Sequence, residues 1–245
     1  KKRGRNYFGL CPVHNEKTPS FSVNPDRQIY KCFGCGIGGS SIDFIMEVEK
    51  LDFVEAIRYL AEQYSIELEI SGQRSSGKDI RTELYEMNAH TQNLYKQNLY
   101  RDENQVHLEY FLNRGIDKEL IEKFGLGLSF NKWNIVWESF QGKKLQTKSM
   151  LECGLFTDTK KGYIDRFRNR IMFTIHDSTG KPIAFAGRAI DKNDNAKYIN
   201  SPETLIYNKS KTLYGLHQTK NKISSEDCAI IVEGYFDFLQ IYKSG

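Results

Sequence analysis

Two short pairs of metal-ligating side chains near the N-terminus constrain the fold of this chain more than any other feature. Cys11 and His14 are separated by two residues, as are Cys32 and Cys35, and 17 residues lie between the two pairs. Each pair can present two donors from one turn, and three thiolates with one imidazole satisfy a tetrahedral Zn²⁺ ion completely. A closed shell of this kind indicates a structural ion, with iron in the same shell as the alternative.

The segment that carries these ligands, residues 1–40, is too short to bury a stabilising core of its own. Its sequence predicts short strands, because "FSV" and "QIY" flank the turn sequence "NPDR". Metal binding would therefore supply folding free energy directly, and a small β zinc ribbon is expected. The other two of the five cysteines, Cys153 and Cys228, are isolated, so we expect no disulfide framework.

The pattern becomes helical after the ribbon and is then interrupted. Residues 41–70 carry apolar side chains at helical spacing, and Asp52 with Glu55 three residues later is typical of a capping box. Residues 71–79, "SGQRSSGKD", are typical of a flexible linker. The N-terminal part is thus expected to be joined to the rest of the chain by a tether.

Beyond the linker the sequence predicts helices followed by a sheet. One helix is expected from Ile80 to about Tyr100 and another over residues 116–125, where Gly125 would end it. The apolar runs of residues 170–177 and 181–190, joined through "STG", predict a β-hairpin. "CAIIV" (228–232) predicts a buried strand, and the residues after Gly234 predict the start of a helix.

Charge is segregated along the chain, although the net formal charge is only +4. Lys and Arg outnumber acids seven to two in residues 1–35 and thirteen to five in residues 160–222, whereas residues 40–110 hold seven against fourteen. Basic blocks of this kind suit a partner with a phosphate backbone, with a solvated surface as the alternative. There is no run of 18 apolar residues and no secretory signal, so we expect a cytoplasmic protein without membrane contact.

The stretch "GRNYFGLCPVHNEKTPSFSVNPDRQIYKCFGCGIGGSSIDFI" closely resembles the zinc-ribbon domain of bacterial replicative DNA primases. The similarity continues in order through "YFLNRGI", "RFRNRIMFTIHD", "AFAGRAI", "KYINSPETLIYNKSKTLYGL" and "IIVEGYFDF". Several motifs in one order are more specific than a zinc site alone. Lys31 departs from the histidine that the family has beside its third ligand, a change that should not disturb coordination.

The resemblance implies template-directed synthesis of short RNA primers on single-stranded DNA by metal-assisted nucleotidyl transfer. Single-stranded DNA and ribonucleoside triphosphates would be the partners, and the family's replicative helicase would bind through a C-terminal domain absent here. The fold class would be α/β (α+β). The implied parts are a zinc ribbon over residues 1–40 with a helical extension over 41–70, a linker over 71–79, an N-terminal polymerase subdomain over 80–227, and the first βα unit of a Toprim fold over 228–245.

In a Toprim fold, a glutamate after the first strand and a later Asp-x-Asp pair hold Mg²⁺ or Mn²⁺, and Glu233 in "VEGYFD" matches that glutamate. Such ions prefer oxygen ligands, and a metal pair neutralises the triphosphate while orienting the attacking and leaving oxygens. No Asp-x-Asp occurs in the chain, so we expect an incomplete metal site and a fragment of a larger enzyme. Asp237 would contribute indirectly to catalysis, or else serve only as an acid at a helix N-terminus.

Basic side chains supply candidates for nucleotide and template binding. Arg166, Arg168 and Arg170 alternate in "RFRNR", so an extended strand would place them on one face. They would bind phosphates there, or merely keep a strand edge soluble. The resemblance adds positions near the incoming nucleotide and the template groove: Arg114, Arg188, Lys197, Tyr198 and Asn200. Without the family, Arg114 would be interpreted as part of an ordinary helix end.

The zinc ribbon also combines basic and aromatic residues, a combination typical of single-stranded DNA binding. Its basic residues are Lys1, Lys2, Arg3, Arg5 and Lys31. Among its aromatic residues, Phe21 and Phe33 are expected to form the small core around the metal, whereas Tyr7 and Tyr30 would either join that core or stack on bases of the DNA.

Two other functions are alternatives to primer synthesis. The first is a catalytically silent, zinc-dependent module that binds single-stranded DNA, which the missing Asp-x-Asp would suit. The second is another Toprim enzyme, such as a topoisomerase or a nuclease. It is disfavoured because a topoisomerase needs a tyrosine nucleophile in a further domain and "KYINSPET" resembles primases.

Overall fold

The computed structural model describes most of the chain, namely residues 1–49, 51, 53–64, 66, 68, 79–191, 194 and 196–245. These residues form two compact units, one of Lys1–Ser75 with Gln218–Ala229 and one of Ser76–His217 with Ile230–Gly245. The predicted capping box at Asp52 and the predicted linker, apart from Asp79, lie outside the described residues. Within those ranges, no helix combines the length and the apolar character that crossing a bilayer requires.

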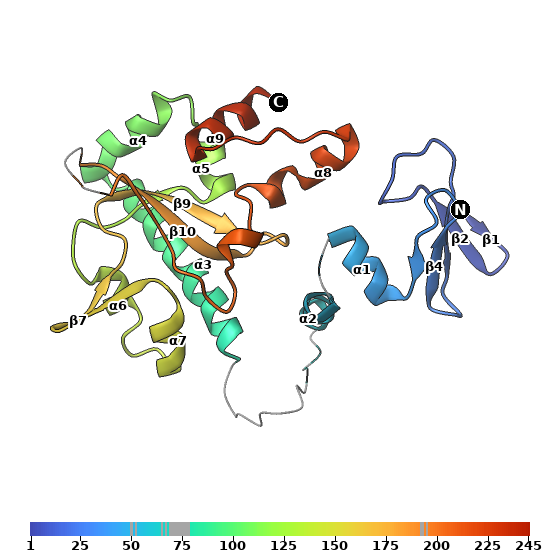
Figure 1. Cartoon of the computed structure of the whole chain (residues 1–245), viewed down its shortest axis with the longest axis horizontal. Helices are drawn as coiled ribbons and strands as arrows, with labels where there is room; N and C mark the ends of the chain where they lie inside the picture. The colour runs from blue at the N-terminus through green and yellow to red at the C-terminus, as the bar shows by residue number, and fades with distance from the viewer. Residues whose placement is uncertain are drawn as a thin grey trace. The chain divides into compact units, whose positions relative to one another are not determined.

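The N-terminal unit is built on an antiparallel sheet of five short strands that are neighbours in chain order (Figure 1). The strands are β1 (Lys2–Arg3), β2 (Asn6–Gly9), β3 (Phe21–Asn24), β4 (Ile29–Cys32) and β5 (Gly38–Gly39), followed by helices α1 (Ser41–Glu49) and α2 (Phe53–Gln63). The tight turn predicted at "NPDR" joins β3 to β4, with Gln28 N donating to Pro25 O at 3.2 Å. The small β ribbon is thus confirmed.

A few side chains form the core of this ribbon. The rings of Phe21 and Tyr30 stack with centroids 5.3 Å apart, and Phe44 from α1 packs against both. Side chains alternate along β4, so Tyr30 and Cys32 are buried, whereas Phe33 just beyond the strand is 70% exposed. The prediction that Phe33 belongs to this core is wrong, because Phe33 has the outward parity of the strand and Tyr30 the inward one.

The second unit is organised around a four-stranded antiparallel sheet in the order β11-β10-β9-β6. Its strands are β6 (Gly127–Leu128), β9 (Arg170–His176), β10 (Pro182–Ala189) and β11 (Tyr198–Asn200), and a separate hairpin is formed by β7 (Phe156–Thr159) and β8 (Gly162–Asp165). In the predicted β9–β10 hairpin, Phe185 pairs with Thr174 and Arg188 with Ile171. This pairing confirms the hairpin.

The helices described in this unit include the two that the sequence predicted. They are α3 (Ile80–Leu99), η1 (Asp102–Asn104), α4 (Gln105–Leu112), α5 (Lys118–Phe124), α6 (Ile135–Ser139), α7 (Thr147–Glu152), η2 (Lys209–Lys211) and α9 (Tyr235–Ser244), whereas α8 (Leu216–Glu226) belongs to the N-terminal unit from Gln218 onwards. Asp117 caps α5 by accepting a hydrogen bond from Leu120 N at 2.9 Å. Gly125 ends α5 with φ of 58°, a conformation that favours glycine.

The central sheet carries an apolar core on each face, so β9 is almost wholly buried. Met172 packs into the cluster that includes Tyr95 of α3 and Phe185 of β10, with α3 running behind the sheet (Figure 1). Ile171 and Phe173 pack into the other cluster, which includes residues of α4, α5 and α9. Ile171, Met172 and Phe173 therefore alternate between the two cores, as side chains of a strand buried on both faces do.

The strand predicted at residues 228–232 is not formed. These residues have no regular secondary structure, and Ile230 and Ile231 are 71% and 83% exposed. A strand requires a neighbour for its N–H and C=O groups, and no described strand pairs with this segment. The helix expected after Gly234 is present as α9.

Candidate functional site

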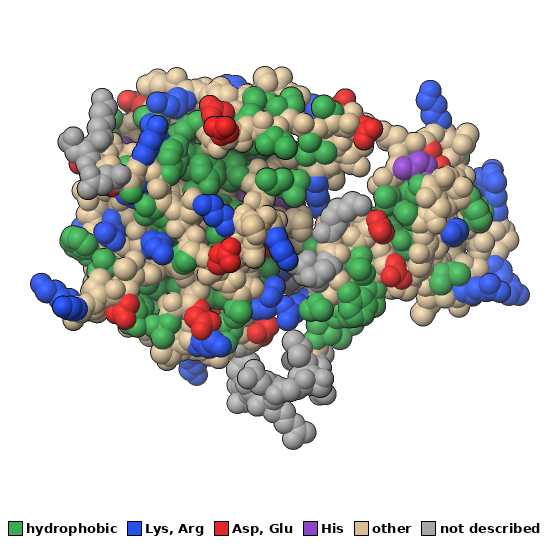
Figure 2. Space-filling view, in the orientation of Figure 1, with side chains coloured by type: hydrophobic (Ala, Val, Ile, Leu, Met, Phe, Trp, Pro, Cys, Tyr) green, Lys and Arg blue, Asp and Glu red, His purple; other side chains and the backbone are tan. Residues whose placement is uncertain are grey.

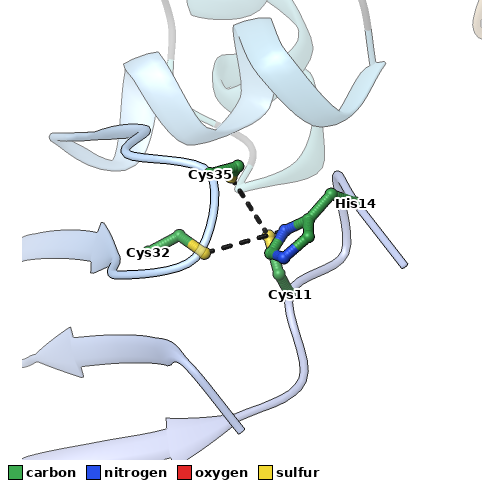
Figure 3. A group of neighbouring side chains, drawn as sticks. All are labelled: Cys11, His14, Cys32 and Cys35. Atoms are coloured by element: carbon green, nitrogen blue, oxygen red, sulfur yellow. Dashed lines mark hydrogen bonds between the residues drawn. The ribbon is translucent and has the colours of Figure 1, made fainter. Parts of the chain in front are cut away.

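The four predicted zinc ligands come together from two turns of the N-terminal unit (Figure 3). One donor atom of each residue lies within 4.8 Å of every other. The Sγ atoms of Cys11 and Cys35 are 3.9 Å apart, and Cys32 Sγ is 3.7 Å from His14 Nδ1. Ligands around a tetrahedral zinc ion stand about 3.5–3.8 Å from one another, given its bond lengths. The donor set therefore fits Zn²⁺.

The surroundings of the Cys32 thiol favour its ionised form, which is the form that binds a metal. Burial opposes its ionisation, but the Ser20 hydroxyl beside the sulfur and the hydrogen bonds from the backbone N–H groups of Cys35 and Gly34 outweigh burial and lower the pKa of Cys32 to about 6. Ser20 Oγ lies 3.2 Å from the sulfur. Thiolate is the form that binds zinc, so a thiol that ionises near neutral pH suits a structural metal centre.

Glu233 and Asp237 lie at the start of α9, where both are exposed. Asp237 is in the first turn of the helix, and its carboxylate folds back over Gly234, so that a Cβ on this glycine would be 2.4 Å from Asp237 Oδ2. Across the described ranges, only the Cys/His group brings three or more potential metal ligands together. The described carboxylates therefore do not by themselves complete a catalytic divalent metal site.

A pocket of about 410 Å³ opens on the second unit and gathers three of the predicted basic residues. Its lining comprises His107, Tyr110, Arg114, Ile171, Arg188, Ala189, Ile190, Asp191, Asp194 and Lys197. The cationic side chains come from three separate segments: the end of α4, strand β10 and the approach to β11. These three cations outnumber the two acids of the lining, Asp191 and Asp194, and Asp194 is paired with Arg170, so the pocket favours an anionic ligand.

Two aromatic rings support the arginines of this pocket. The guanidinium of Arg114 lies 3.8 Å from the ring centroid of Tyr110 and 5.5 Å from that of Phe236. The guanidinium of Arg188 lies 5.5 Å and 5.6 Å from the same two rings. Sequence reasoning missed Tyr110 and Phe236, because nothing in the local patterns relates an aromatic on α4 to one on α9. Cation–π contacts of this kind hold both arginines in place.

Tyr198 and Asn200 lie on β11 beside this pocket. Burial, together with the charge of Asp237, raises the pKa of Tyr198 against the opposing charges of Arg188 and Arg114, so its hydroxyl lies within the field of all three groups. The hydroxyl of Tyr235 donates to Asn200 Oδ1 at 3.3 Å. Tyr198 is 37% exposed and open to a ligand, whereas Asn200 contacts α9.

The prediction that Arg166, Arg168 and Arg170 share one face of a strand is wrong. Only Arg170 belongs to a strand, because the chain turns at Asn169, whose φ of 51° is incompatible with extended structure. Arg170 is buried and pairs with Asp194 at 2.5 Å. The three guanidinia therefore point to different surroundings, and that of Arg170 is already paired inside the protein.

Arg168 lies over an exposed aromatic ring that sequence reasoning also missed. Its guanidinium is 4.6 Å from the ring centroid of Trp133, and its Nη1 donates to Asp165 O. Trp133 is 64% exposed. An exposed indole beside an arginine forms a platform on which a base can stack.

The chain thus combines a metal-binding ribbon with a basic pocket. Basic surfaces of this kind suit polyanionic partners. Residues 1–76 match the family model of the CHC2 zinc finger, and residues 94–220 match that of the DNA primase catalytic core, N-terminal domain. The chain belongs to this DNA primase family.

Individual relatives agree with the family match. The DNA primase of Clostridium acetobutylicum is 42% identical over 248 residues, which cover 100% of this chain and 41% of that protein. The crystal structure of the Aquifex aeolicus primase, with its zinc-binding and RNA polymerase domains, is 35% identical with a TM-score of 0.60, and the match covers 99% of this chain and 58% of that one. A DnaG primase catalytic domain bound to single-stranded DNA is 32% identical with a TM-score of 0.59, over 67% of this chain and 51% of that one. The chain thus spans less than half the length of the curated relative.

Proposed function

We propose that this chain contributes the zinc-binding and N-terminal catalytic-core parts of a primase that makes short RNA primers on a single-stranded DNA template. The observation that carries the proposal is the basic pocket, in which Arg114, Arg188 and Lys197 converge within a domain of the primase family. Their positive charges would bind phosphate groups of the incoming ribonucleoside triphosphate or of the template. Tyr198, exposed beside the pocket, would stack on a base or contact a sugar.

The template would run past two further surfaces. Trp133 with Arg168 offers a stacking platform on the second unit. On the N-terminal unit, Lys and Arg side chains stand out from the surface (Figure 2), and Lys2 Nζ lies 5.5 Å from the ring centroid of the half-exposed Tyr7. A related catalytic domain was solved with single-stranded DNA, which supports DNA as the partner.

A divalent cation, Mg²⁺ or Mn²⁺, would neutralise charge on the triphosphate during nucleotidyl transfer. Glu233 would be one of its ligands, with Asp237 nearby in an indirect role. The described residues supply no further group of carboxylates beside them, so the metal-dependent step would need ligands from outside these residues. Contact with a replicative helicase would likewise use a domain beyond them.

Binding to an oligonucleotide tests the role of the pocket directly. Single-stranded DNA carrying a fluorophore is titrated with the chain at several salt concentrations, and the anisotropy is recorded. We expect Arg188→Ala and Lys197→Ala each to weaken binding several-fold and to reduce the salt slope by about 0.7, the value for one lost phosphate contact. Lys118→Ala, which removes an exposed lysine of α5 outside the pocket, is the matched control.

The aromatic support of the pocket can be tested in the same assay. Tyr110→Leu keeps an apolar side chain but removes the ring that both arginines face. Each cation–π contact contributes about 0.5–2 kcal/mol, so a loss of affinity of a few-fold is expected. Unchanged affinity would show that the arginines do not depend on this ring.

Primer synthesis separates the enzyme from its rival, a silent DNA-binding module. The full-length product of the gene is incubated with single-stranded DNA, labelled ribonucleotides and Mg²⁺ or Mn²⁺. RNA products that disappear in Glu233→Gln and decline in Arg188→Ala support the proposal. If the same protein binds DNA tightly but yields no RNA with either metal, the binding-module function is correct.

A further inference from the structure

Glu16 is outside the zinc ligand set, yet its carboxylate contacts two of the ligand residues. Its Oε1 atom accepts hydrogen bonds from Cys11 N at 2.7 Å and from Ser20 N at 3.1 Å. Its Oε2 atom accepts from the Ser20 hydroxyl and lies 3.4 Å from His14 Nε2. Both oxygens of this half-buried carboxylate are therefore occupied within the metal-binding turn.

Ser20 extends these contacts to the second ligand pair. Its Oγ atom lies 3.2 Å from Cys32 Sγ and accepts a hydrogen bond from Gly34 N at 3.2 Å. Gly34 has no room for a side chain, because a Cβ there would lie 2.7 Å from His14 Nε2 and 2.8 Å from Ser20 Oγ. The Glu16 carboxylate and the Ser20 hydroxyl thus connect three of the four ligands in a tightly packed group.

The orientation of the imidazole gives the carboxylate a specific role. His14 Nδ1 faces the sulfur of Cys32, so a metal bound by the four ligands would take Nδ1 and leave the proton on Nε2. That N–H then requires an acceptor, and Glu16 Oε2 is the oxygen that it faces. A ligand histidine whose second nitrogen donates to a carboxylate has a fixed tautomer and ring orientation, and is a better donor to zinc.

We propose that Glu16 is a positioning residue of the zinc centre, which holds His14 in the orientation that binds the metal through Nδ1 and links it through Ser20 to Cys32. The carboxylate does not bind the ion itself. Removing such an outer partner lowers metal affinity by about 10- to 100-fold in other zinc sites. The same range is expected for Glu16→Gln, in which the side chain keeps its size and a carbonyl oxygen but loses the charge.

Zinc affinity is the first measurement. The zinc-loaded chain competes with a chromophoric chelator, and Glu16→Gln is compared with Asp26→Asn, which removes one negative charge from the exposed β3–β4 turn of the same unit. We expect the first substitution to lower affinity by 10-fold or more and the second to leave it within two-fold. Equal affinities of Glu16→Gln and the unaltered chain would overturn the proposal.

The ring proton of His14 supplies a readout that a merely structural role would not change. In the zinc-loaded, ¹⁵N-labelled chain, we expect a downfield, slowly exchanging Nε2–H signal among the five histidines, assigned by its loss in His14→Cys. If the unaltered chain lacks that signal, the proposal fails, whether or not Glu16→Gln folds. In a His14→Cys background there is no imidazole to orient, so Glu16→Gln should then cost much less affinity. Fully additive losses would contradict the proposed link.

Discussion

The two units of this chain are stabilised in opposite ways. The N-terminal ribbon has a core of about four buried apolar residues, two of which are zinc ligands. The second unit buries two extensive clusters, one on each face of its central sheet. The ribbon therefore depends on a metal, whereas the second unit depends on apolar packing. One chain can therefore combine two units whose stability responds to different conditions.

Removal of zinc should distinguish the two units most clearly. Chelation, or Cys32→Ser, should unfold the ribbon, because structural zinc supplies roughly 10–16 kcal/mol in small metal-dependent domains. The second unit should keep its transition temperature. Both tryptophans, Trp133 and Trp137, lie in the second unit, so their fluorescence reports on it alone, while NMR of β3 and β4 amides reports on the ribbon. Cys228→Ser, at an exposed cysteine outside the metal centre, should change neither unit.

A buried phenylalanine of the second unit should be far more sensitive than an exposed one of the ribbon. Phe185 is fully buried, and its ring lies 5.5 Å from that of Tyr95 and 6.2 Å from that of Phe167. Phe185→Ala should lower the free energy of unfolding of this unit by about 3–5 kcal/mol, because it creates a cavity. Phe33→Ala in the ribbon should change its stability by less than about 0.5 kcal/mol. Denaturant titrations at saturating zinc measure both.

Acid should also weaken the second unit through His176, a half-buried histidine at the end of β9. Burial, followed by the nearby charge of His217, lowers the pKa of His176 to about 4. The unfolded chain takes up this proton near pH 6.5 and the folded chain only near 4, so the unfolded state binds more protons between these values. The free energy of unfolding should therefore fall by roughly 3 kcal/mol as the pH drops from 6.5 to 4. His176→Gln should flatten this dependence in tryptophan-monitored denaturation, and an unchanged slope would assign it to other groups.

The smallest effect concerns a helix cap. Asp117→Ala removes the side chain that accepts from Leu120 N at the start of α5, which should cost about 1 kcal/mol. The transition temperature of the second unit should fall by about 2–4 °C. Asp158→Ala, at an exposed position of β7, controls for the lost charge. Equal shifts in the two variants would show that charge, rather than the cap, is responsible.

Local features of both units could be predicted from the sequence, because nearby residues determine them. The spacing of the zinc ligands places their donors on two turns, and Asp117 with Gly125 marks the two ends of α5. The β9–β10 hairpin follows from two apolar runs joined by a short turn. In these cases the physical cause lies within a few residues of the pattern.

Features that depend on distant parts of the chain could not be predicted in this way. Tyr110 and Phe236 meet the two arginines only because α4, β10 and α9 pack together. The expected row of three arginines is absent because the positive φ at Asn169 turns the chain out of the strand. The expected strand at residues 228–232 is absent because no described strand lies beside it to pair with. Local sequence patterns carry no information about such tertiary packing, strand pairing or single backbone angles.

The alternation of side chains along β4 has a consequence for how the ribbon can diverge. Tyr30 and Cys32 face the metal and the core, whereas Ile29 and Lys31 face outward, with Phe33 just beyond them. Substitutions at Ile29 and Phe33 alter the outer surface without replacing a ligand, whereas Lys31 also donates to Gly36 O at 2.8 Å in the turn that carries Cys35. The outer surface of this ribbon can therefore change during evolution while its metal-dependent folding stays constant, and the exposed positions offer a compact library for engineering new specificity.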